Sequence, residues 1–361
     1  MTSEVFHMHV LAAGHGDCLW IEYGDAIAPA RILVDAGTPG TFKRLGPKLA
    51  KVRGSQPSHE LFLITHIDAD HIGGSLKVLE TPDAAAQFKE VWFNGRKHLD
   101  QAKGLEDFGA VQAERLTRAI LDNKLNWNVS VGGGPLTRRS KLRLQSHEFA
   151  GAKVTVLTPT PHELVELIDA WDEEITKAGL DPKKPLKASK EPLPGYEALG
   201  IVDVEALANR PYSEDTAPAN GSSISTLIEF KGIRVLLGAD AHPSVLLAGI
   251  RQLHPEGPLE VDVFKLPHHG SAANVTSDLL DAVNAKTVVL SSNGAYFKHP
   301  DQTAVARVLR RYKTQGVHLV FNYRSTLNEM WDSDSLRLKW NYTTEYGSGT
   351  EGVTVQLMSA D

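Results

Sequence analysis

The stretch Thr65-His66-Ile67-Asp68-Ala69-Asp70-His71-Ile72-Gly73-Gly74 decides both the fold and where to look for function. It follows the apolar run 60–65, which predicts a strand buried on both faces. Four side chains that can bind a metal lie within six residues of one another: His66, Asp68, Asp70 and His71. Histidine offers a neutral ring nitrogen and aspartate a charged oxygen. We therefore expect a metal site where this strand ends, beside a helix that the paired glycines allow to start close by.

Three further groups of polar side chains stand where other predicted strands end. They are Asp35 after 30–34, Asp240 after 233–237, and His268 with His269 after 261–266. Each group alone is weak evidence for a metal site, because an aspartate before glycine is commonly a turn residue. Together with the first stretch they form one repeated pattern, and we expect these side chains to converge on a crevice at the strand ends.

The composition is that of an ordinary globular protein. The 361 residues are 42% hydrophobic and 23% charged, a size that fits one large domain or two fused halves. The net charge of −6 disfavours strong non-specific attraction to nucleic acid or anionic lipid. One cysteine excludes a disulfide framework and a cysteine-based zinc site. No apolar run approaches about 20 residues and the start lacks a secretory pattern, so we expect a cytoplasmic protein with no membrane partner.

The order of expected elements predicts an α/β (α+β) fold. Strand-like and helix-like segments alternate in both halves, which indicates an αββα sandwich of two mixed β-sheets flanked by helices. We predict a single domain over residues 1–361. Within it we expect a helical insertion at about 83–125 and an irregular connection, rich in proline and lysine, at about 181–220.

The order of the motifs resembles that of the metallo-β-lactamase superfamily. Segments 14–18, 220–223, 237–240, 261–271 and 291–300 are also similar to the hydrolase domain of the ComEC DNA-uptake competence protein and to the pneumococcal phosphorylcholine esterase. Two departures stand out. Asp68 occupies the place of the second histidine that many members carry, and an isolated third-motif histidine is not evident. The candidates by order are His147 and His162, and Asn220 and Ser222 occupy its place in the resembling branch.

The resemblance implies a site for two divalent metal ions, with zinc preferred and manganese as the alternative. It implies that His66 and Asp68 hold one ion, while Asp70, His71 and either His268 or His269 hold the other. Asp240 would bridge them, and Asp35 would support the site from behind. Such a pair of ions holds a bridging hydroxide that attacks the substrate, which makes Asp70 and Asp240 catalytic. His299 is a candidate to protonate the leaving group or, with Lys298, to contact a phosphate.

The expected function is that of a metal-dependent hydrolase, with a dinuclear phosphodiesterase or nuclease preferred. The expected partner is a phosphodiester substrate, with DNA or RNA as candidates. The basic stretch 138–143 near Trp127 could contact nucleic acid, but a solvated strand face is the preferred interpretation. One alternative keeps the site but cleaves a carboxylic ester, lactone or thioester. The other is a metal-stabilised interaction module with little catalysis.

Overall fold

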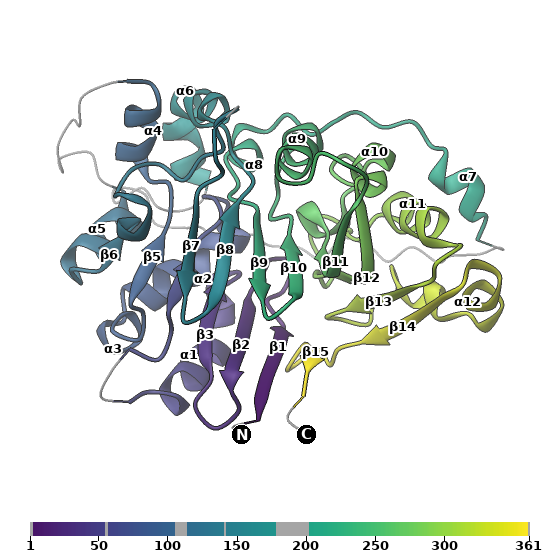
Figure 1. Cartoon of the computed structure of the whole chain (residues 1–361), viewed down its shortest axis with the longest axis horizontal. Coiled ribbons are helices and arrows are strands. Elements are labelled where there is room, and N and C mark those ends of the chain that lie inside the picture. The colour runs from purple at the N-terminus through teal and green to yellow at the C-terminus, as the bar shows by residue number, and fades with distance from the viewer. Residues whose placement is uncertain (1–2, 55–56, 105–113, 141, 178–201, 360–361) are drawn as a thin grey trace.

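The strands of the protein form two mixed β-sheets (Figure 1). The computed structural model describes residues 3–54, 57–104, 114–140, 142–177 and 202–359. In the described chain the first sheet has the order β15-β1-β2-β3-β4-β5-β6, and the second has the order β14-β13-β12-β11-β10-β9-β8-β7. Strands β3 to β6 run parallel, as do β10 to β14, whereas the remaining neighbours are antiparallel.

The bounds of the strands follow the expected apolar runs. The first sheet contains β1 (Glu4–Val10), β2 (Leu19–Asp25), β3 (Ala30–Val34), β4 (Leu61–Leu63), β5 (Glu90–Trp92), β6 (Asn126–Trp127) and β15 (Val353–Met358). The second contains β7 (Ser146–Phe149), β8 (Ala152–Val156), β9 (Thr226–Phe230), β10 (Ile233–Leu237), β11 (Leu259–Lys265), β12 (Val283–Leu290), β13 (Val317–Phe321) and β14 (Tyr342–Tyr346). All three residues of β4 are buried, which confirms the expected strand covered on both faces.

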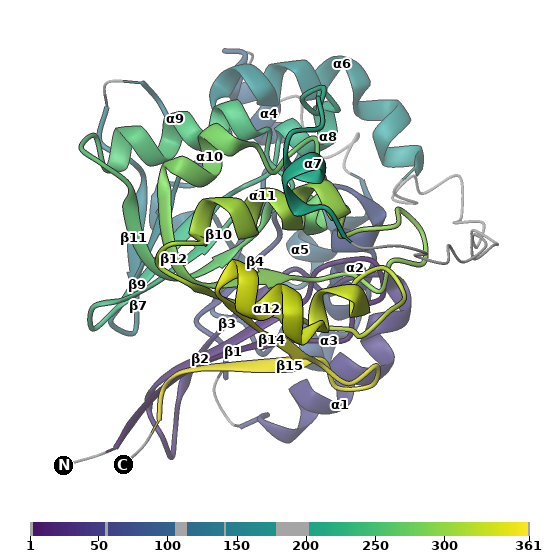
Figure 2. The same cartoon turned by 90° about the vertical axis from the view of Figure 1, so that its right-hand side faces the viewer.

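Helices lie on the outer sides of the two sheets, as Figures 1 and 2 show. They are α1 (Phe42–Lys51), α2 (Ala69–Leu79), α3 (Pro82–Ala85), α4 (Arg96–Ala102), α5 (Arg115–Asp122), α6 (Pro161–Lys177), α7 (Val204–Ala208), α8 (Pro218–Gly221), α9 (Pro243–Leu253), α10 (Ser277–Asp281), α11 (Gln302–Tyr312) and α12 (Asp334–Trp340). Among the described residues, each helix is too short or too polar to cross a lipid bilayer.

The hydrophobic core has three layers, which defines the sandwich. The middle layer joins the inner faces of the two sheets, with Phe6 and Met8 on one side and Val263 and Val320 on the other. A second layer packs the first sheet against helices such as α1 and α2. A third packs the second sheet against helices such as α9, α10 and α11. These layers confirm the predicted αββα arrangement of two mixed sheets flanked by helices.

The predicted helical insertion at about 83–125 is wrong as a description of the whole segment. It contains β5, which pairs in parallel with β4 and β6 and therefore belongs to the first sheet. The three residues of β5 are all buried, and three residues are too few to show the alternation that separates a strand from a helix. Residues 105–113 of this segment lie outside the described chain.

The predicted irregular connection at about 181–220 contains two short helices in its described part. Helix α7 contributes Val204 and Leu207 to the outer core of the second sheet, and α8 contributes Ala219 to that of the first. The lysine-rich part of the segment, residues 183–190, lies outside the described chain.

A buried histidine far from the strand-end crevice makes stability depend on pH. His59 is 0% exposed, and burial, with a smaller effect of Arg31, lowers its pKa to about 3. The unfolded chain, with an ordinary histidine pKa of about 6.5, binds more protons below that pH. The stabilising contribution of neutral His59 is therefore complete above pH 6.5 and is lost as the pH falls towards 3.

We expect the free energy of unfolding to fall by up to about 1.4 kcal/mol per pH unit on account of His59 in that range. Urea unfolding between pH 7 and pH 4 measures this slope. His59→Gln should flatten it, whereas a control replacement of the exposed His162 by glutamine should not. An unchanged slope in His59→Gln would contradict the assignment.

Candidate metal centre

The predicted polar groups meet at the carboxyl ends of parallel strands from both sheets. The first sheet contributes Asp35 after β3 and the segment 66–71 after β4, and the second contributes Asp240 after β10 and the pair 268–269 after β11. Strand ends of parallel sheets carry their functional groups on the same edge. The structure thus brings together every residue that the sequence proposed as a metal ligand.

Close approach of α2 places the first group of side chains. Asp68 directly precedes α2, and Asp70 and His71 lie in its first turn. A Cβ atom on Gly74 would lie 1.9 Å from the carbonyl oxygen of Ala36. The helix can therefore reach this position only because the residue has no side chain, as the paired glycines predict.

Four histidine rings surround one oxygen of Asp240. Their Nε2 atoms lie at the following distances from Asp240 Oδ2: His71 3.4 Å, His269 3.7 Å, His66 3.8 Å and His268 3.8 Å. Asp240, His66, His71 and His269 are buried. The side chain of His268 is 20% exposed and forms the solvent side of the group.

The other nitrogen of each ring has its own partner. The Nδ1 contacts are His66 with Thr65 Oγ1 at 3.0 Å, His71 with Asp35 Oδ2 at 2.8 Å, His268 with Asn274 Oδ1 at 2.9 Å, and His269 with the Ser291 carbonyl at 2.8 Å. Carboxylate, amide and carbonyl oxygens only accept hydrogen bonds. The Thr65 hydroxyl donates its hydrogen to Asp35 and is left to accept. In the neutral form, all four rings would carry the hydrogen on Nδ1 and leave Nε2 free to bind a cation beside Asp240.

Two further carboxylates complete the group. Asp70 Oδ2 lies 3.4 Å from His269 Nε2, and Asp68 Oδ2 lies 3.8 Å from His66 Nε2. His269 is thus the member of the histidine pair that contacts Asp70, a choice that the sequence left open. His268 contacts Asp240 from the solvent side.

The charges of the group favour a cation. Burial alone would lower the pKa of His71, but the carboxylates of Asp240 and Asp35 raise it well above its usual range. Burial likewise opposes ionisation of Asp240, but the neighbouring imidazoles, His71 foremost, hold its pKa well below the usual range. At Asp68, burial and then the charges of Asp70 and Asp240 raise the pKa to about 7. A divalent cation would relieve this repulsion between carboxylates.

The residues present fit a divalent metal ion. In the described chain, buried His66 Nε2 and Asp240 Oδ1 have no hydrogen-bond partner, and such atoms are costly unless a ligand satisfies them. The ligand atoms of His66, His71 and Asp240 all lie within 4.8 Å of one another. Imidazole and carboxylate donors at this spacing are typical of zinc and manganese sites.

A buried ion pair supports the centre from the second sheet. Lys265 Nζ donates to Asp17, whose carboxylate also accepts from the Ser291 hydroxyl and lies 3.3 Å from His269 Nδ1. A Cβ on Gly16 would lie 1.7 Å from the Asp70 carbonyl oxygen, so the loop that carries Asp17 touches α2. The sequence pointed to this loop and to Lys265 only through the similarity of segments 14–18 and 261–271, and it did not indicate that Asp17 and Lys265 pair.

Asn220 and Asp215 connect the third-motif region to the centre. Asp215 Oδ2 lies 3.4 Å from His268 Nδ1 and accepts hydrogen bonds from Asn220 Nδ2 at 2.7 Å and Asn274 Nδ2 at 2.9 Å. Asn220 thus acts on His268 through Asp215, whereas the Ser222 hydroxyl donates to a backbone carbonyl. Asp215 and Asn274 lay in no motif that sequence reasoning could recognise.

The other sequence candidates lie elsewhere. His147 is in β7, the outermost strand of the second sheet, where it packs against Phe149. His162 is exposed in the first turn of α6. Arg138, a member of the basic stretch 138–143, lies outside any strand, is buried and donates to Gln252, so it presents no exposed charge on a strand face.

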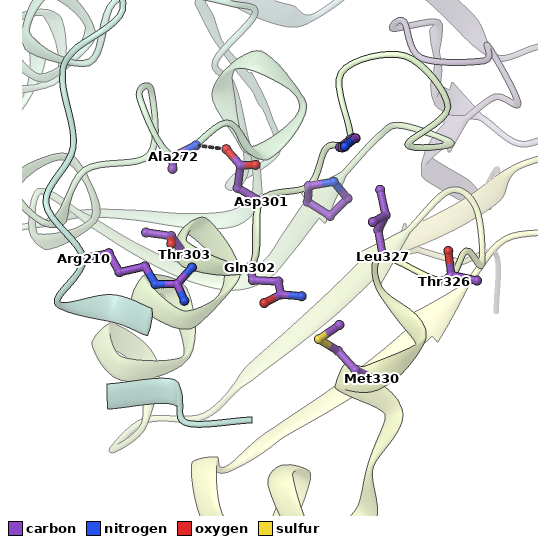
Figure 3. Close-up of a pocket in the computed structure, with 10 residues that line it drawn as sticks. Arg210, Ala272, Asp301, Gln302, Thr303, Thr326, Leu327 and Met330 are labelled. Atoms are coloured by element: carbon purple, nitrogen blue, oxygen red, sulfur yellow. Dashed lines mark hydrogen bonds between the residues drawn. The ribbon is translucent and has the colours of Figure 1, made fainter. Parts of the chain in front are cut away.

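His299 lies beside the centre and next to a cavity. Its ring centroid is 5.3 Å from that of His268, and its Nδ1 atom is 3.7 Å from Asp301 Oδ1. The neighbouring Pro300 and Asp301 line a cavity of about 440 Å³, in which Asp301 accepts a hydrogen bond from the backbone nitrogen of Ala272 (Figure 3). The segment that carries His299 thus contacts the centre on one side and this cavity on the other.

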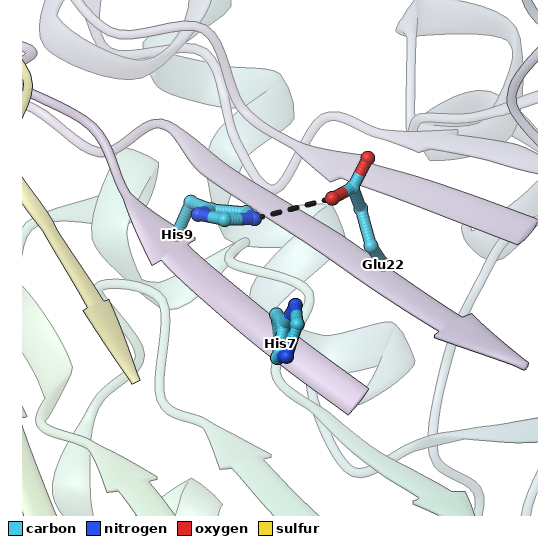
Figure 4. A group of neighbouring side chains, drawn as sticks. All are labelled: His7, His9 and Glu22. Atoms are coloured by element: carbon cyan, nitrogen blue, oxygen red, sulfur yellow. Dashed lines mark hydrogen bonds and ion pairs between the residues drawn. The ribbon is translucent and has the colours of Figure 1, made fainter. Parts of the chain in front are cut away.

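A second histidine cluster lies on the first sheet (Figure 4). His7 and His9 project from one face of β1, and Glu22 on β2 lies opposite His7. His9 Nε2 is 3.3 Å from Glu22 Oε2, and Arg31 Nε donates to the other oxygen at 2.8 Å. The arginine already supplies the positive charge that Glu22 needs, so this cluster serves as a control for the strand-end centre.

A comparison with protein families agrees with the αββα sandwich that the structure shows. The model of the metallo-β-lactamase superfamily matches residues 14–90, which span Asp17, Asp35 and the segment 66–71. No curated protein matches the chain. The fold, the His/Asp groups and the superfamily match together support a metallo-β-lactamase-fold protein with the side chains of a metal-dependent hydrolase.

Three solved structures align with nearly the whole length of the chain at low identity. Zn²⁺-bound PqqB from Methylobacterium extorquens is 12% identical, with a TM-score of 0.44 and coverage of 97% of this chain and 100% of that one. The metallo-β-lactamase fold protein YhfI from Bacillus subtilis is 8% identical, with a TM-score of 0.40 and coverage of 98% and 99%. A diphosphatase from the PhnP family is 10% identical, with a TM-score of 0.39 and coverage of 100% of both chains.

Proposed function

We propose that the protein is a metal-dependent phosphodiesterase with two divalent cations, zinc or manganese, in the strand-end centre. The observation that carries this proposal is the set of four imidazoles whose Nε2 atoms lie 3.4–3.8 Å from Asp240 Oδ2, with Asp68 and Asp70 beside them. In this arrangement His66 and Asp68 would hold one cation, and Asp70, His71 and His269 would hold the other, with Asp240 available to both. Cations bound here would supply Lewis-acid stabilisation of charge on the phosphoryl oxygens.

The chain's own residues fix the geometry of this site. Asp35, Asn274 and the Ser291 carbonyl each hold one histidine ring in the tautomer that presents Nε2. Such outer partners orient ligands and raise their basicity. Burial of Asp240 and three of the four rings excludes water from the inner part of the centre, which strengthens electrostatic interactions there.

His299 is the proposed proton donor to the departing alcohol. Its Nδ1 atom is buried, has no hydrogen-bond partner in the described chain, and faces the carboxylate of Asp301. Burial lowers the pKa of this ring, and the Asp301 carboxylate opposes that shift only in part, so a protonated His299 would be a strong acid towards a leaving oxygen. The cavity beside Asp301 offers room for the group that departs.

A phosphodiester is preferred as substrate because the centre is rich in carboxylates. Three aspartates face the imidazoles, a mixture that suits the harder cations used for phosphoryl chemistry as well as zinc. The similarity of the motifs to phosphodiester-cleaving branches of the superfamily also supports this choice. DNA or RNA is the proposed natural form of the substrate.

With Mn²⁺ or Zn²⁺ bound, we expect the protein to hydrolyse bis(p-nitrophenyl) phosphate with a higher kcat/KM than carbon esters. The assay compares kcat/KM for this diester with p-nitrophenyl acetate, a lactone and a thioester. A preference for carbon esters by orders of magnitude would identify the alternative esterase. Absence of turnover on all substrates, with little bound metal, would identify the interaction module.

The same assay tests His299. His299→Gln should lower kcat by about 100-fold or more for a diester with an alkyl leaving group, the contribution typical of a general acid. The loss should be smaller for p-nitrophenolate, which leaves without a proton. Equal losses on both substrates would indicate that His299 only positions its neighbours.

A further inference from the structure

A series of aromatic rings leads from the candidate metal centre to the surface. The ring of Phe297 lies 6.5 Å from that of His268 and stacks on His299 at 6.1 Å. Tyr296 meets Phe297 edge to face at 4.5 Å and stacks on His15 at 5.2 Å. Rings from two distant segments of the chain thus form one group, which we call the aromatic rim and define as His15, Tyr296 and Phe297.

The outer rings of the rim are open to solvent. Tyr296 is 45% exposed and Phe297 is 46% exposed. Neighbouring exposed aromatic side chains are more informative than scattered ones, because they offer apolar area that a partner can cover. Here the exposed area lies next to the residues of a reaction centre, so its natural partner is part of the substrate.

One hydrogen bond joins the two segments of the rim, and a second orders the segment that carries Tyr296 and Phe297. The backbone nitrogen of Asn293 donates to the Gly14 carbonyl at 2.9 Å, and that of Ala295 donates to Asn293 Oδ1 at 3.0 Å. Gly294 has φ +71°, and a Cβ there would lie 2.5 Å from Leu327 Cδ1. The rings are therefore positioned before a ligand arrives, which lowers the entropic cost of binding.

We propose that the aromatic rim stacks against a planar base of the substrate while the adjoining phosphodiester lies at the metal centre. The substrate class is then a nucleotidyl phosphodiester. This inference rests on the proposed phosphodiesterase function and adds the specificity of the site. Stacking on aromatic side chains accepts any base, because every base has a π face.

The openness of the rim favours a flat base over a quaternary ammonium group. Recognition of such a cation uses several rings that enclose it. Tyr296 and Phe297 each keep nearly half of their surface exposed, so they form an open shelf.

The test compares a dinucleotide, thymidylyl-thymidine, with a dialkyl diester, glycerophosphoglycerol. Phe297→Leu and Tyr296→Leu keep apolar bulk but remove one ring each. We expect KM for the dinucleotide to rise about tenfold per ring, since stacking contributes about 1–3 kcal/mol per base and 1.4 kcal/mol is tenfold. KM for the dialkyl diester should not change. Tyr296→Phe keeps the ring and should behave as the unaltered protein, as should Leu338→Ala at an exposed position on α12.

A binding measurement tests the aromatic rim independently of catalysis. Equilibrium dialysis compares the affinity for thymidine monophosphate with that for glycerol phosphate. Weaker nucleotide binding in the double variant Tyr296→Leu/Phe297→Leu, without turnover of any diester, would overturn the proposed reaction and leave the rim assignment standing. Equal nucleotide binding by the unaltered protein and the double variant would overturn the rim assignment. So would an equal loss of turnover on both substrate classes, or a preference for a diester of a quaternary ammonium alcohol.

Discussion

Replacement of Asp240 by asparagine is expected to remove most of the bound metal and to lower kcat/KM for a phosphodiester by more than about 100-fold. Loss of an outer partner of a metal ligand already costs about 10–100-fold in affinity or activity, and Asp240 stands at the centre of the group. Its Oδ2 atom lies within 3.4–3.8 Å of four Nε2 atoms, and its Oδ1 atom has no hydrogen-bond partner in the described chain. Asparagine keeps the volume of the side chain and removes only the charge.

Metal content per chain and kcat/KM are the two measurements for this variant. Asp35→Asn provides a graded comparison, because Asp35 acts on His71 Nδ1 and should cost only about 10–100-fold. His9→Gln, in the separate cluster on β1 and β2, should retain both metal and activity. Full metal content with unimpaired turnover in Asp240→Asn would refute the proposed centre.

Replacement of Asp17 by asparagine is expected to destabilise the protein by about 3–5 kcal/mol, because it leaves the charge of Lys265 buried and uncompensated. Both side chains of this ion pair are almost fully buried. Burial raises the pKa of Asp17, but the nearby Lys265 and His269 lower it by more. The pKa of Asp17 therefore lies far below its usual range. The free energy of unfolding in urea at pH 7 measures the effect.

A double variant separates the ion pair from packing. Asp17→Asn/Lys265→Met removes both charges and should recover most of the lost stability, since a buried pair contributes little over an apolar replacement. The exposed pair Lys231–Glu4 is the matched control, and Lys231→Met should cost less than about 1 kcal/mol. A loss of that small size in Asp17→Asn would show that the buried pair is not coupled to stability.

The sequence predicted those parts of the centre that lie in one short segment or at recognisable strand ends. The segment 66–71, Asp240 and the pair 268–269 could be found because histidines and aspartates cluster after apolar runs. The choice between His268 and His269 could not, because it depends on where each ring points. Only the structure shows that His269 faces Asp70.

Supporting residues were hidden because their roles depend on three-dimensional contacts. Asn274 and Asp215 are polar residues of irregular segments, and Lys265 ends a strand without any partner near it in the sequence. The strand β5 was missed for a different reason, since three buried residues are too few for an alternating pattern. The helix α11 (302–312), by contrast, is long enough for its apolar residues to recur at helical spacing, the kind of signal that a sequence can show.

The centre draws its side chains from both sheets, with Asp35 and the segment 66–71 from one and Asp240 and His268–His269 from the other. Neither half of the polypeptide, produced alone, would carry a complete set of donors. Fragments severed at an exposed hairpin would therefore be inert individually and would regain metal uptake only on reassociation. Metal uptake would then serve as an assay for correct docking of the two halves.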